Sequence, residues 1–257
     1  MKDLDYLLEF LLRFSERMLI SGANLERVDD SVYRICDAYG CQDVQFFSLN
    51  CYLSLSMKNQ AGENASGQRC IWGGLDVHLE NLSQLNQLSR QICAEKPAPE
   101  TLEGLLQEAV QTKGYSQSML LAGFLLAMAG LTGVFDGSLK DLAVILVNSA
   151  LIFLAGVYLK RLVYNKIVFN VLCTFVAGSV AIGAVTLGLA DDLYIVMIVN
   201  SMMLIPGIPM VNSFRNILCG NEINGIVEFF KVILETTAIV GGFILSIYVF
   251  GLLGGAL

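Results

Sequence analysis

Five long stretches without a charged residue fill the second part of this 257-residue chain. A helix rises about 1.5 Å per residue, so about 20 apolar residues are needed to cross the hydrocarbon core of a membrane. The five stretches contain 18 to 24 residues each, which is unusual for a soluble core. The sequence therefore predicts an α-helical membrane domain with five transmembrane helices. These cover about residues 114–135, 140–159, 167–190, 193–213 and 232–254.

Charged residues concentrate in the first part of the chain. Residues 1–115 contain 10 of the 16 lysines and arginines and 16 of the 23 aspartates and glutamates. We therefore expect a small polar domain over residues 1–113, followed by the membrane domain over residues 114–257. This division excludes a disordered chain, a fibrous chain and a wholly soluble enzyme. Nucleic acid is not expected as a partner, because a net charge of −7 leaves no basic surface for phosphates.

Lysines and arginines in short connections set the orientation of membrane helices. If the front domain lies in the cytosol, the outer connections carry only Lys140. The inner side then carries five positive residues, Lys160, Arg161, Lys166, Arg215 and Lys231. The first residues also lack the uninterrupted apolar stretch of a cleaved signal peptide. We expect a multi-pass plasma-membrane protein with a cytoplasmic N-terminal domain and its C-terminus outside.

Hydrophobic periodicity predicts an α+β fold for the front domain. Apolar residues recur at helical spacing over residues 4–19, 24–39, 79–92 and from 102 onward. Asn24 is expected to cap the second helix, and Gly22 and Gly40 to end the first two. Side chains that alternate over residues 51–57 predict a half-buried strand. A second strand is expected over 44–49, with a hairpin loop over 58–67 and a return strand over 68–72.

No motif of enzyme chemistry is present in the sequence. It has no nucleophile elbow, phosphate-binding glycine loop or HExxH motif, and its seven cysteines form no CxxC pair. We interpret the cysteines as reduced thiols and expect no enzyme activity, no cofactor and no metal. His78 is the only histidine, and a surface or structural role is favoured over catalysis. The charged cluster of the second helix is interpreted as a solvated face rather than a binding site; it comprises Glu26, Arg27, Asp29, Asp30 and Arg34.

Prolines interrupt the fourth predicted span. Pro206 and Pro209 flank Gly207 and Ile208, so the helix is expected to break inside or near the membrane. Transporters place substrates at such broken helices, because freed backbone groups must face protein or a watery cavity. Asn212 and Arg215 follow within a few residues and are predicted to line the substrate pathway. The alternatives are a simple kink or an exit at the interface, with Arg215 as a positive-inside anchor.

Other polar residues also lie at predicted membrane depth. Asn148, Asn170 and Asn200 are candidates for the substrate pathway, although hydrogen bonds between helices are the commoner reason for such residues. Glu235 and Glu228 flank Lys231 at helical spacing. A buried carboxylate there would couple proton movement to transport, and the alternative is an interfacial ion pair.

Two segments resemble the signature motifs of the bacterial threonine/serine exporter family. Residues 21–30, SGANLERVDD, are similar to its junction of an SGA or HGA sequence with a following valine and two acidic residues. Residues 204–212, LIPGIPMVN, with Gly220 and Gly225 beyond them, are similar to its membrane motif. The order of a soluble domain and five spans also matches, so the resemblance covers nearly the whole chain. It differs where Phe214, Arg215 and Asn216 replace a segment in which an acidic residue is common, which leaves the substrate's charge open.

The resemblance implies a secondary exporter located in the bacterial plasma membrane. Within the family, this chain resembles the larger subunit of a split, two-component type, which implies a small membrane-protein partner, a homo-oligomer or both. The implied substrate is threonine or serine, and a dicarboxylate such as succinate is the alternative. A membrane-anchored metabolite sensor or scaffold is the alternative from another class, and a membrane-embedded hydrolase is the weakest. A sensor would leave efflux unchanged when its gene is deleted.

Overall fold

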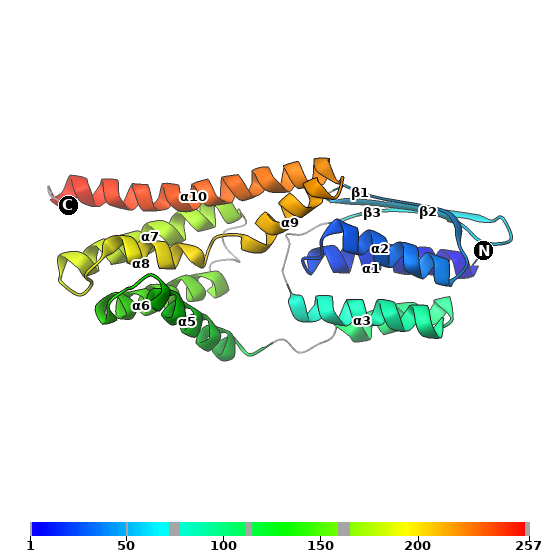
Figure 1. The fold of residues 1–257 in the computed structure, drawn as a ribbon, viewed down its shortest axis with the longest axis horizontal. Helices are drawn as coiled ribbons and strands as arrows, with labels where there is room; N and C mark the ends of the chain where they lie inside the picture. The colour runs from blue at the N-terminus through cyan, green and yellow to red at the C-terminus, as the bar shows by residue number, and fades with distance from the viewer. Residues whose placement is uncertain (1, 50, 72–77, 111–114, 159–164, 255–257) are drawn as a thin grey trace. The chain divides into compact units, whose positions relative to one another are not determined.

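Contacts divide the chain into two compact units. The structure, a computed structural model, describes residues 2–49, 51–71, 78–110, 115–158 and 165–254. The first unit comprises Met1–Lys113 and Ile208–Phe229, and the second comprises Gly114–Gly207 and Phe230–Leu257. Figure 1 labels the elements of both. The late segment Ile208–Phe229 thus groups with the front domain, whereas it lies within the membrane domain expected over residues 114–257.

A three-stranded antiparallel sheet forms one layer of the first unit. Its strands are β1 (Gln42–Leu49), β2 (Tyr52–Lys58) and β3 (Asn64–Cys70), in the order β1-β2-β3. The expected hairpin loop over 58–67 is wrong in length, because residues 64–67 already pair with β2 in the register Lys58↔Asn64. Their polar and small side chains lack the apolar alternation that marks a strand, so the sequence hid the start of β3.

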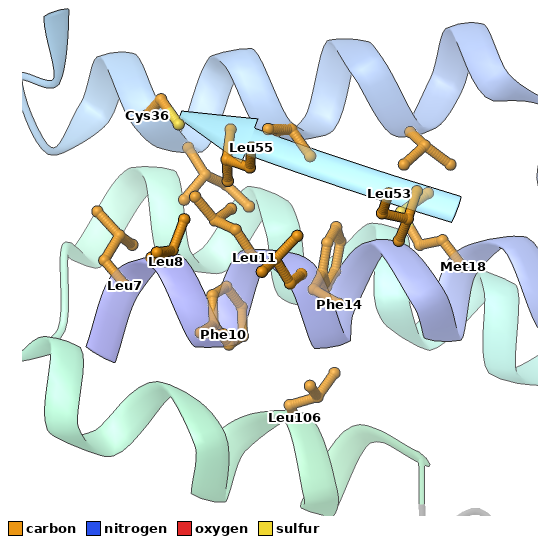
Figure 2. Packing of buried hydrophobic residues seen from close by; sticks show 14 of the residues in the cluster. Leu7, Leu8, Phe10, Leu11, Phe14, Met18, Cys36, Leu53, Leu55 and Leu106 are labelled. Carbon is orange, nitrogen blue, oxygen red and sulfur yellow. The ribbon is translucent and has the colours of Figure 1, made fainter. Parts of the chain in front are cut away.

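Two helices, α1 (Lys2–Ile20) and α2 (Leu25–Ala38), pack on one face of this sheet. The helices α3 (Leu79–Glu95) and α4 (Leu102–Val110), with a short 3-10 turn η1 (Pro99–Thr101) before α4, pack in turn on these helices. The α1 helix lies so close to β3 that a Cβ on Gly67 would stand 2.9 Å from Leu12 Cδ1. Figure 2 shows the resulting core, in which Leu53 and Leu55 of β2 lie on one side of α1 and Leu106 of α4 lies on the other, the side to which Phe10 points. Each such side chain stabilises the fold by about 1.5–3 kcal/mol through burial.

Two glycines end the first two helices, as the sequence predicts. Gly22 follows α1 with φ of +94°, and Gly40 follows α2 with φ of +69°. At the second position the amide of Cys41 donates to the carbonyl of Cys36 and the amide of Gly40 donates to Asp37, which is a Schellman motif. Asn24 holds the N-cap position of α2, but its side chain makes no capping hydrogen bond, so that expectation is wrong.

The second unit is helical throughout its described residues. It contains α5 (Gln117–Val134), α6 (Leu139–Tyr158), α7 (Lys166–Thr186) and α8 (Leu193–Met202). Two further helices carry residues of both units, α9 (Gly207–Leu218) and α10 (Glu222–Gly254). Four helices among the described residues are long and apolar enough to cross a membrane, and α8 with α9 adds a fifth if that bent pair forms one span. The expected class, a helical membrane protein with a small α+β part in front, is confirmed at this level.

Close helix packing in the second unit depends on Gly178 and Gly242. A Cβ on Gly242 would lie 2.0 Å from Thr174 Oγ1, and one on Gly178 would lie 2.2 Å from Ser246 Oγ. Therefore α7 and α10 approach each other where neither glycine carries a side chain. By contrast, the glycines of α5 and a glycine near the end of α10 have open space beside them; these are Gly123, Gly130, Gly133 and Gly251.

A buried carboxylate ties the start of α6 to the connection before α8. Asp141 is 1% exposed, and its Oδ1 accepts hydrogen bonds from the amides of Asp191 and Asp192 at 2.8 and 3.0 Å. Its Oδ2 accepts from the amide of Ser138 at 3.0 Å. Lys140 pairs with Asp191 at 2.9 Å beside it. Three charge-assisted bonds compensate for the burial of this charge.

Candidate functional site

The two signature segments meet in the first unit, although about 190 residues separate them in the sequence. Gly22 ends α1 in a left-handed conformation, which leaves its carbonyl free of the helix. Asn212 of α9 donates its Nδ2 to this carbonyl at 3.3 Å. The turn between α1 and α2 is therefore joined directly to the helix that follows the proline break.

Charged groups of α2 and α9 form a second link. Arg215 Nη2 lies 3.0 Å from Glu26 Oε2, and its Nε lies 3.3 Å from the same oxygen. Cys219 Sγ is 3.5 Å from that oxygen as well. The hydrogen bonds from Arg215, and to a smaller extent that from Cys219, lower the pKa of the Glu26 carboxyl. Arg215, predicted to meet a substrate carboxylate, thus already has a carboxylate of its own chain as partner.

The hairpin of α9 and α10 is itself tightly built. Gly220 turns the chain with φ of +86°, and a Cβ on Gly225 would stand 2.7 Å from the carbonyl oxygen of Ser213. Asn216, which is buried, donates Nδ2 to Glu228 Oε2 at 3.1 Å. The glycines of the membrane motif therefore permit a close helix hairpin, which is a physical reason for their positions.

A third link joins this hairpin to the sheet. Asn224 of α10 is 9% exposed and donates Nδ2 to the backbone carbonyl of Ser48 at 2.8 Å. Ser48 pairs with Leu53 across β1 and β2, so both point to the sheet face that the helices cover. The three links together fix the α9–α10 hairpin on the turn before α2, on α2 itself and on the end of β1.

A cavity of about 270 Å³ lies beside these links, wholly within the first unit. It is lined by Leu25 and Asp29 of α2, residues 46–49 of β1, and residues 220–224 of the hairpin. Asp29 is half-buried, and burial, together with the charge of Glu26, raises the pKa of its carboxyl to about 6. The Ser48 hydroxyl oxygen is buried without a hydrogen-bond partner among the described residues.

The sequence interpretation of the α2 charges was only partly right. Asp30 and Arg34 form the expected exposed pair at 2.9 Å. Glu26 is also exposed but pairs with Arg215 of α9, and Asp29 is half-buried and lines the cavity. The signal that could have found these positions is that both residues lie inside the SGANLERVDD motif.

The predicted polar residues of the membrane helices lie in the second unit and bond mainly within it. Asn148 donates Nδ2 to the carbonyl of Ala177 at 3.0 Å, and Asn200 donates Nδ2 to Val196 at 2.7 Å. Ser149 Oγ lies 3.3 Å from Asn200 Oδ1 and joins α6 to α8. These bonds support the helix-to-helix interpretation. Within the described residues, Asn148 Oδ1 and Asn170 Nδ2 are buried without a partner, so both retain capacity for a ligand.

Glu235 and Glu228 fall in different units. Glu235 has a side chain that is 5% exposed and pairs with Lys166 Nζ at 2.7 Å, not with the expected Lys231. Lys166 begins α7, which places it beside α10, whereas Lys231 is exposed. A role of either glutamate in proton coupling stays a prediction.

The prolines coincide with a real interruption of the fourth span. The α8 helix ends at Met202, α9 begins at Gly207, and the two are bent by 61°. Two of the freed amides, those of Leu204 and Ile205, donate to the carbonyl of Ser201. Pro206 is buried before the helix restarts, and Pro209 lies in the first turn of α9, where a missing amide has no cost.

His78 stands at the N-cap position of α3, and its side chain makes no capping hydrogen bond. Among the described residues no group of three or more histidine, cysteine or acidic side chains could hold a metal ion.

Comparisons with known proteins agree with this arrangement. No solved structure matches the chain. The curated threonine/serine exporter of Corynebacterium glutamicum is 24% identical over 240 residues, which is 90% of this chain and 48% of that protein. The chain therefore spans about half the length of this curated relative. The profile of the ThrE threonine/serine exporter family matches residues 9–250, which contain both signature segments. The chain belongs to the threonine/serine exporter family.

Proposed function

We propose that this chain is a subunit of a secondary exporter that moves threonine or serine out of the bacterial cytosol. The observation that carries the proposal is the docking of the α9–α10 hairpin on the front domain, through Asn212, Arg215 and Asn224. A simple membrane anchor does not need its fourth span to break and bind its own soluble domain. An exporter that works by alternating access needs such a connection between a cytosolic gate and its membrane helices.

Five spans are favoured over four by the docking of the α9–α10 hairpin on the front domain. With both in the cytosol, the chain must cross the membrane between the end of α7 and the start of α9, so α8 with the interrupted residues after it forms the fourth, broken span. The α10 helix contains 33 residues and is therefore about 50 Å long, whereas the hydrocarbon core is about 30 Å thick. About 20 Å of it extends beyond the membrane, which agrees with its first residues contacting the front domain, and its C-terminal end lies outside.

The substrate pathway is proposed to pass the break at residues 203–206. Pro206, Gly207 and Pro209 leave the backbone irregular there, and helix ends at membrane depth are suited to polar groups. Asn200 precedes the break, and Asn148 and Asn170 have unused hydrogen-bonding atoms. Glu235, buried against Lys166, is the stronger of the two candidates for proton coupling.

A second protein chain or further copies of this one complete the pathway. A small membrane partner is the favoured arrangement, because the chain resembles the larger subunit of the family's split, two-component type. A homo-oligomer is the alternative. The open space beside the glycines of α5 is consistent with either, because small residues permit close approach of another helix.

A membrane-anchored sensor is the second candidate function. It is favoured by one observation, namely that the cavity beside Asp29 lies wholly within the front unit. A dicarboxylate such as succinate is the alternative cargo of the exporter. Both alternatives are separated from the main proposal by one efflux measurement.

The experiment loads cells with a threonine-containing dipeptide and follows the loss of threonine and succinate in parallel. Wild-type cells are compared with a gene deletion and with the deletion complemented by this gene, alone or with its small neighbouring gene. Slower loss of threonine in the deletion, restored by the gene, supports the amino-acid exporter. Slower loss of succinate instead identifies a dicarboxylate exporter, and unchanged loss of both solutes supports the sensor.

A further inference from the structure

The cavity beside α2 has a one-sided charge. Among the residues that the structure describes, its lining contains two carboxylates, Asp29 and Glu222, and no lysine, arginine or histidine. The other polar groups that line it are the amides of Asn221 and Asn224 and the hydroxyl of Ser48. Such a lining repels anions and attracts a cation that can donate hydrogen bonds.

Asp29 is the group that most needs a ligand. Its carboxylate is half-buried, and no hydrogen bond or ion pair to it is found among the described residues. The nearest basic residue of the hairpin, Arg215, is engaged by Glu26. A half-buried carboxylate without a partner is unfavourable in its charged form, which is why its pKa is raised.

Ser48 supplies a second, independent sign of a ligand. Its hydroxyl oxygen is buried without a partner among the described residues, although most buried polar atoms in proteins are hydrogen-bonded. Asn224 holds the backbone carbonyl of the same residue at 2.8 Å, so the end of β1 is fixed in place. A ligand with a hydroxyl or ammonium group would satisfy this atom.

The dimensions fit a small solute. The cavity of about 270 Å³ is slightly smaller than the usual range for ligand pockets, about 300–1,000 Å³, which suits a small solute. Phe46, which lies on the same sheet face as Ser48, provides an aromatic wall, and aromatic faces attract ammonium groups. A dicarboxylate would bring two negative charges to two carboxylates and is therefore disfavoured.

We propose that this cavity binds the α-ammonium group of a small amino acid, with the Asp29 carboxylate as its charge partner and the Ser48 hydroxyl as a further contact. This inference rests on the proposed function, because export supplies the reason for an amino acid to meet the cytosolic domain. It gives the front domain a binding role for the cargo next to the hairpin that leads into the membrane helices.

The test titrates the purified full chain in detergent with L-threonine, N-acetyl-L-threonine and succinate. We expect L-threonine to bind and both other compounds to bind at least about tenfold more weakly, because neither has an ammonium group. Asp29→Asn should weaken L-threonine binding at least about tenfold, since loss of one partner of a desolvated charge pair usually has this effect or a larger one. Asp30→Asn is the matched control, because that neighbouring carboxylate is exposed and pairs with Arg34.

Several results would overturn the inference. These are equal binding of L-threonine and N-acetyl-L-threonine by the wild-type protein, no binding of L-threonine at millimolar concentrations, and unchanged binding by the Asp29→Asn variant. The first two need no variant and are independent of any folding defect. The proposed function is judged separately by efflux. If threonine efflux depends on the gene but the Asp29→Asn variant binds L-threonine as the wild type does, the binding site is wrong and the exporter function is supported. If Asp29→Asn weakens L-threonine binding but threonine efflux does not depend on the gene, the binding site is supported and the exporter function is wrong.

Discussion

Gly241 and Gly242 allow a test of close helix packing, because replacing either one with alanine adds the same methyl group in different surroundings. Both lie in the interior of α10. A Cβ on Gly242 would stand 2.0 Å from Thr174 Oγ1 and 2.6 Å from the carbonyl oxygen of Val171, whereas a Cβ on Gly241 would meet nothing within 4 Å. Gly242→Ala therefore forces α7 and α10 apart, and Gly241→Ala leaves them in place.

The magnitudes follow from two opposing effects. Alanine is favoured over glycine in a helix by about 1 kcal/mol, so Gly241→Ala should stabilise the protein by up to about that amount. Gly242→Ala has the same gain, but overpacking of a close contact typically costs about 1–3 kcal/mol. The backbone carbonyl of Val171 cannot rotate away as a side chain can. We therefore expect the two variants to differ by about 1–3 kcal/mol in the free energy of unfolding.

Thermal unfolding of the two purified variants in the same detergent, followed by far-UV circular dichroism, measures this difference. For a chain of this size, 1 kcal/mol corresponds to about 2–4 °C in Tm. Modification of Cys173 by a maleimide gives a second measurement, because this thiol is buried on α7 beside Thr174 and should react faster in Gly242→Ala. Equal melting temperatures, or a higher value for Gly242→Ala, would refute the close approach of α7 and α10 at this point.

Three further predictions concern the first unit. Folding raises the pKa of Asp29 from 3.8 to about 6. The protonated carboxyl therefore contributes its full stabilisation of the fold below about pH 3.8, and this contribution is lost as the pH rises through about 6. Without ligand, Asp29→Asn should raise Tm at pH 7.5 but not at pH 4. Asn224→Ala leaves the Ser48 carbonyl without its donor, a cost of about 1–3 kcal/mol, and should speed hydrogen exchange of the α9–α10 hairpin. Iodoacetamide should modify Cys41 before Cys36, because contact between the two thiols lowers the pKa of Cys41 and raises that of the buried Cys36; peptide mass spectrometry measures the order.

The membrane helices could be predicted from the sequence because the bilayer imposes a simple requirement. A run of about 20 residues without charge has few other uses, so α5, α6 and α7 were expected close to their observed positions. The upstream part of α10 was not expected, because Glu228 and Lys231 end an apolar run without ending a helix. Likewise, glycine spacing did not show which glycines pack. Gly178 and Gly242 have close neighbours and Gly130 has none, and this depends on the partner helix.

The candidate site was harder to predict because its parts are far apart in the chain. An acidic residue on an amphipathic helix can pair with a residue from any later segment, and the partner of the exposed Glu26 is Arg215, 189 residues later. Local patterns contain no information about such a contact. Only the two signature motifs, each matched separately, indicated that residues 21–30 and 204–225 have special roles. The unpartnered Ser48 hydroxyl had no sequence signal at all.

The two connections of the α9–α10 hairpin to the second unit differ in stiffness. On one side the chain leaves the hairpin through residues 203–206, where the helix is interrupted between Met202 and Gly207. On the other side α10 continues without interruption from Glu222 to Gly254, and an unbroken helix transmits a displacement along its axis. A ligand that alters the contacts of Asn224 near the cavity would therefore act on the membrane helices mainly through α10, while the proline break absorbs the change on the other side. The three links between the hairpin and the front domain are contacts of the kind that such a ligand would have to change, since a ligand can shift an equilibrium only through contacts that differ between the two states.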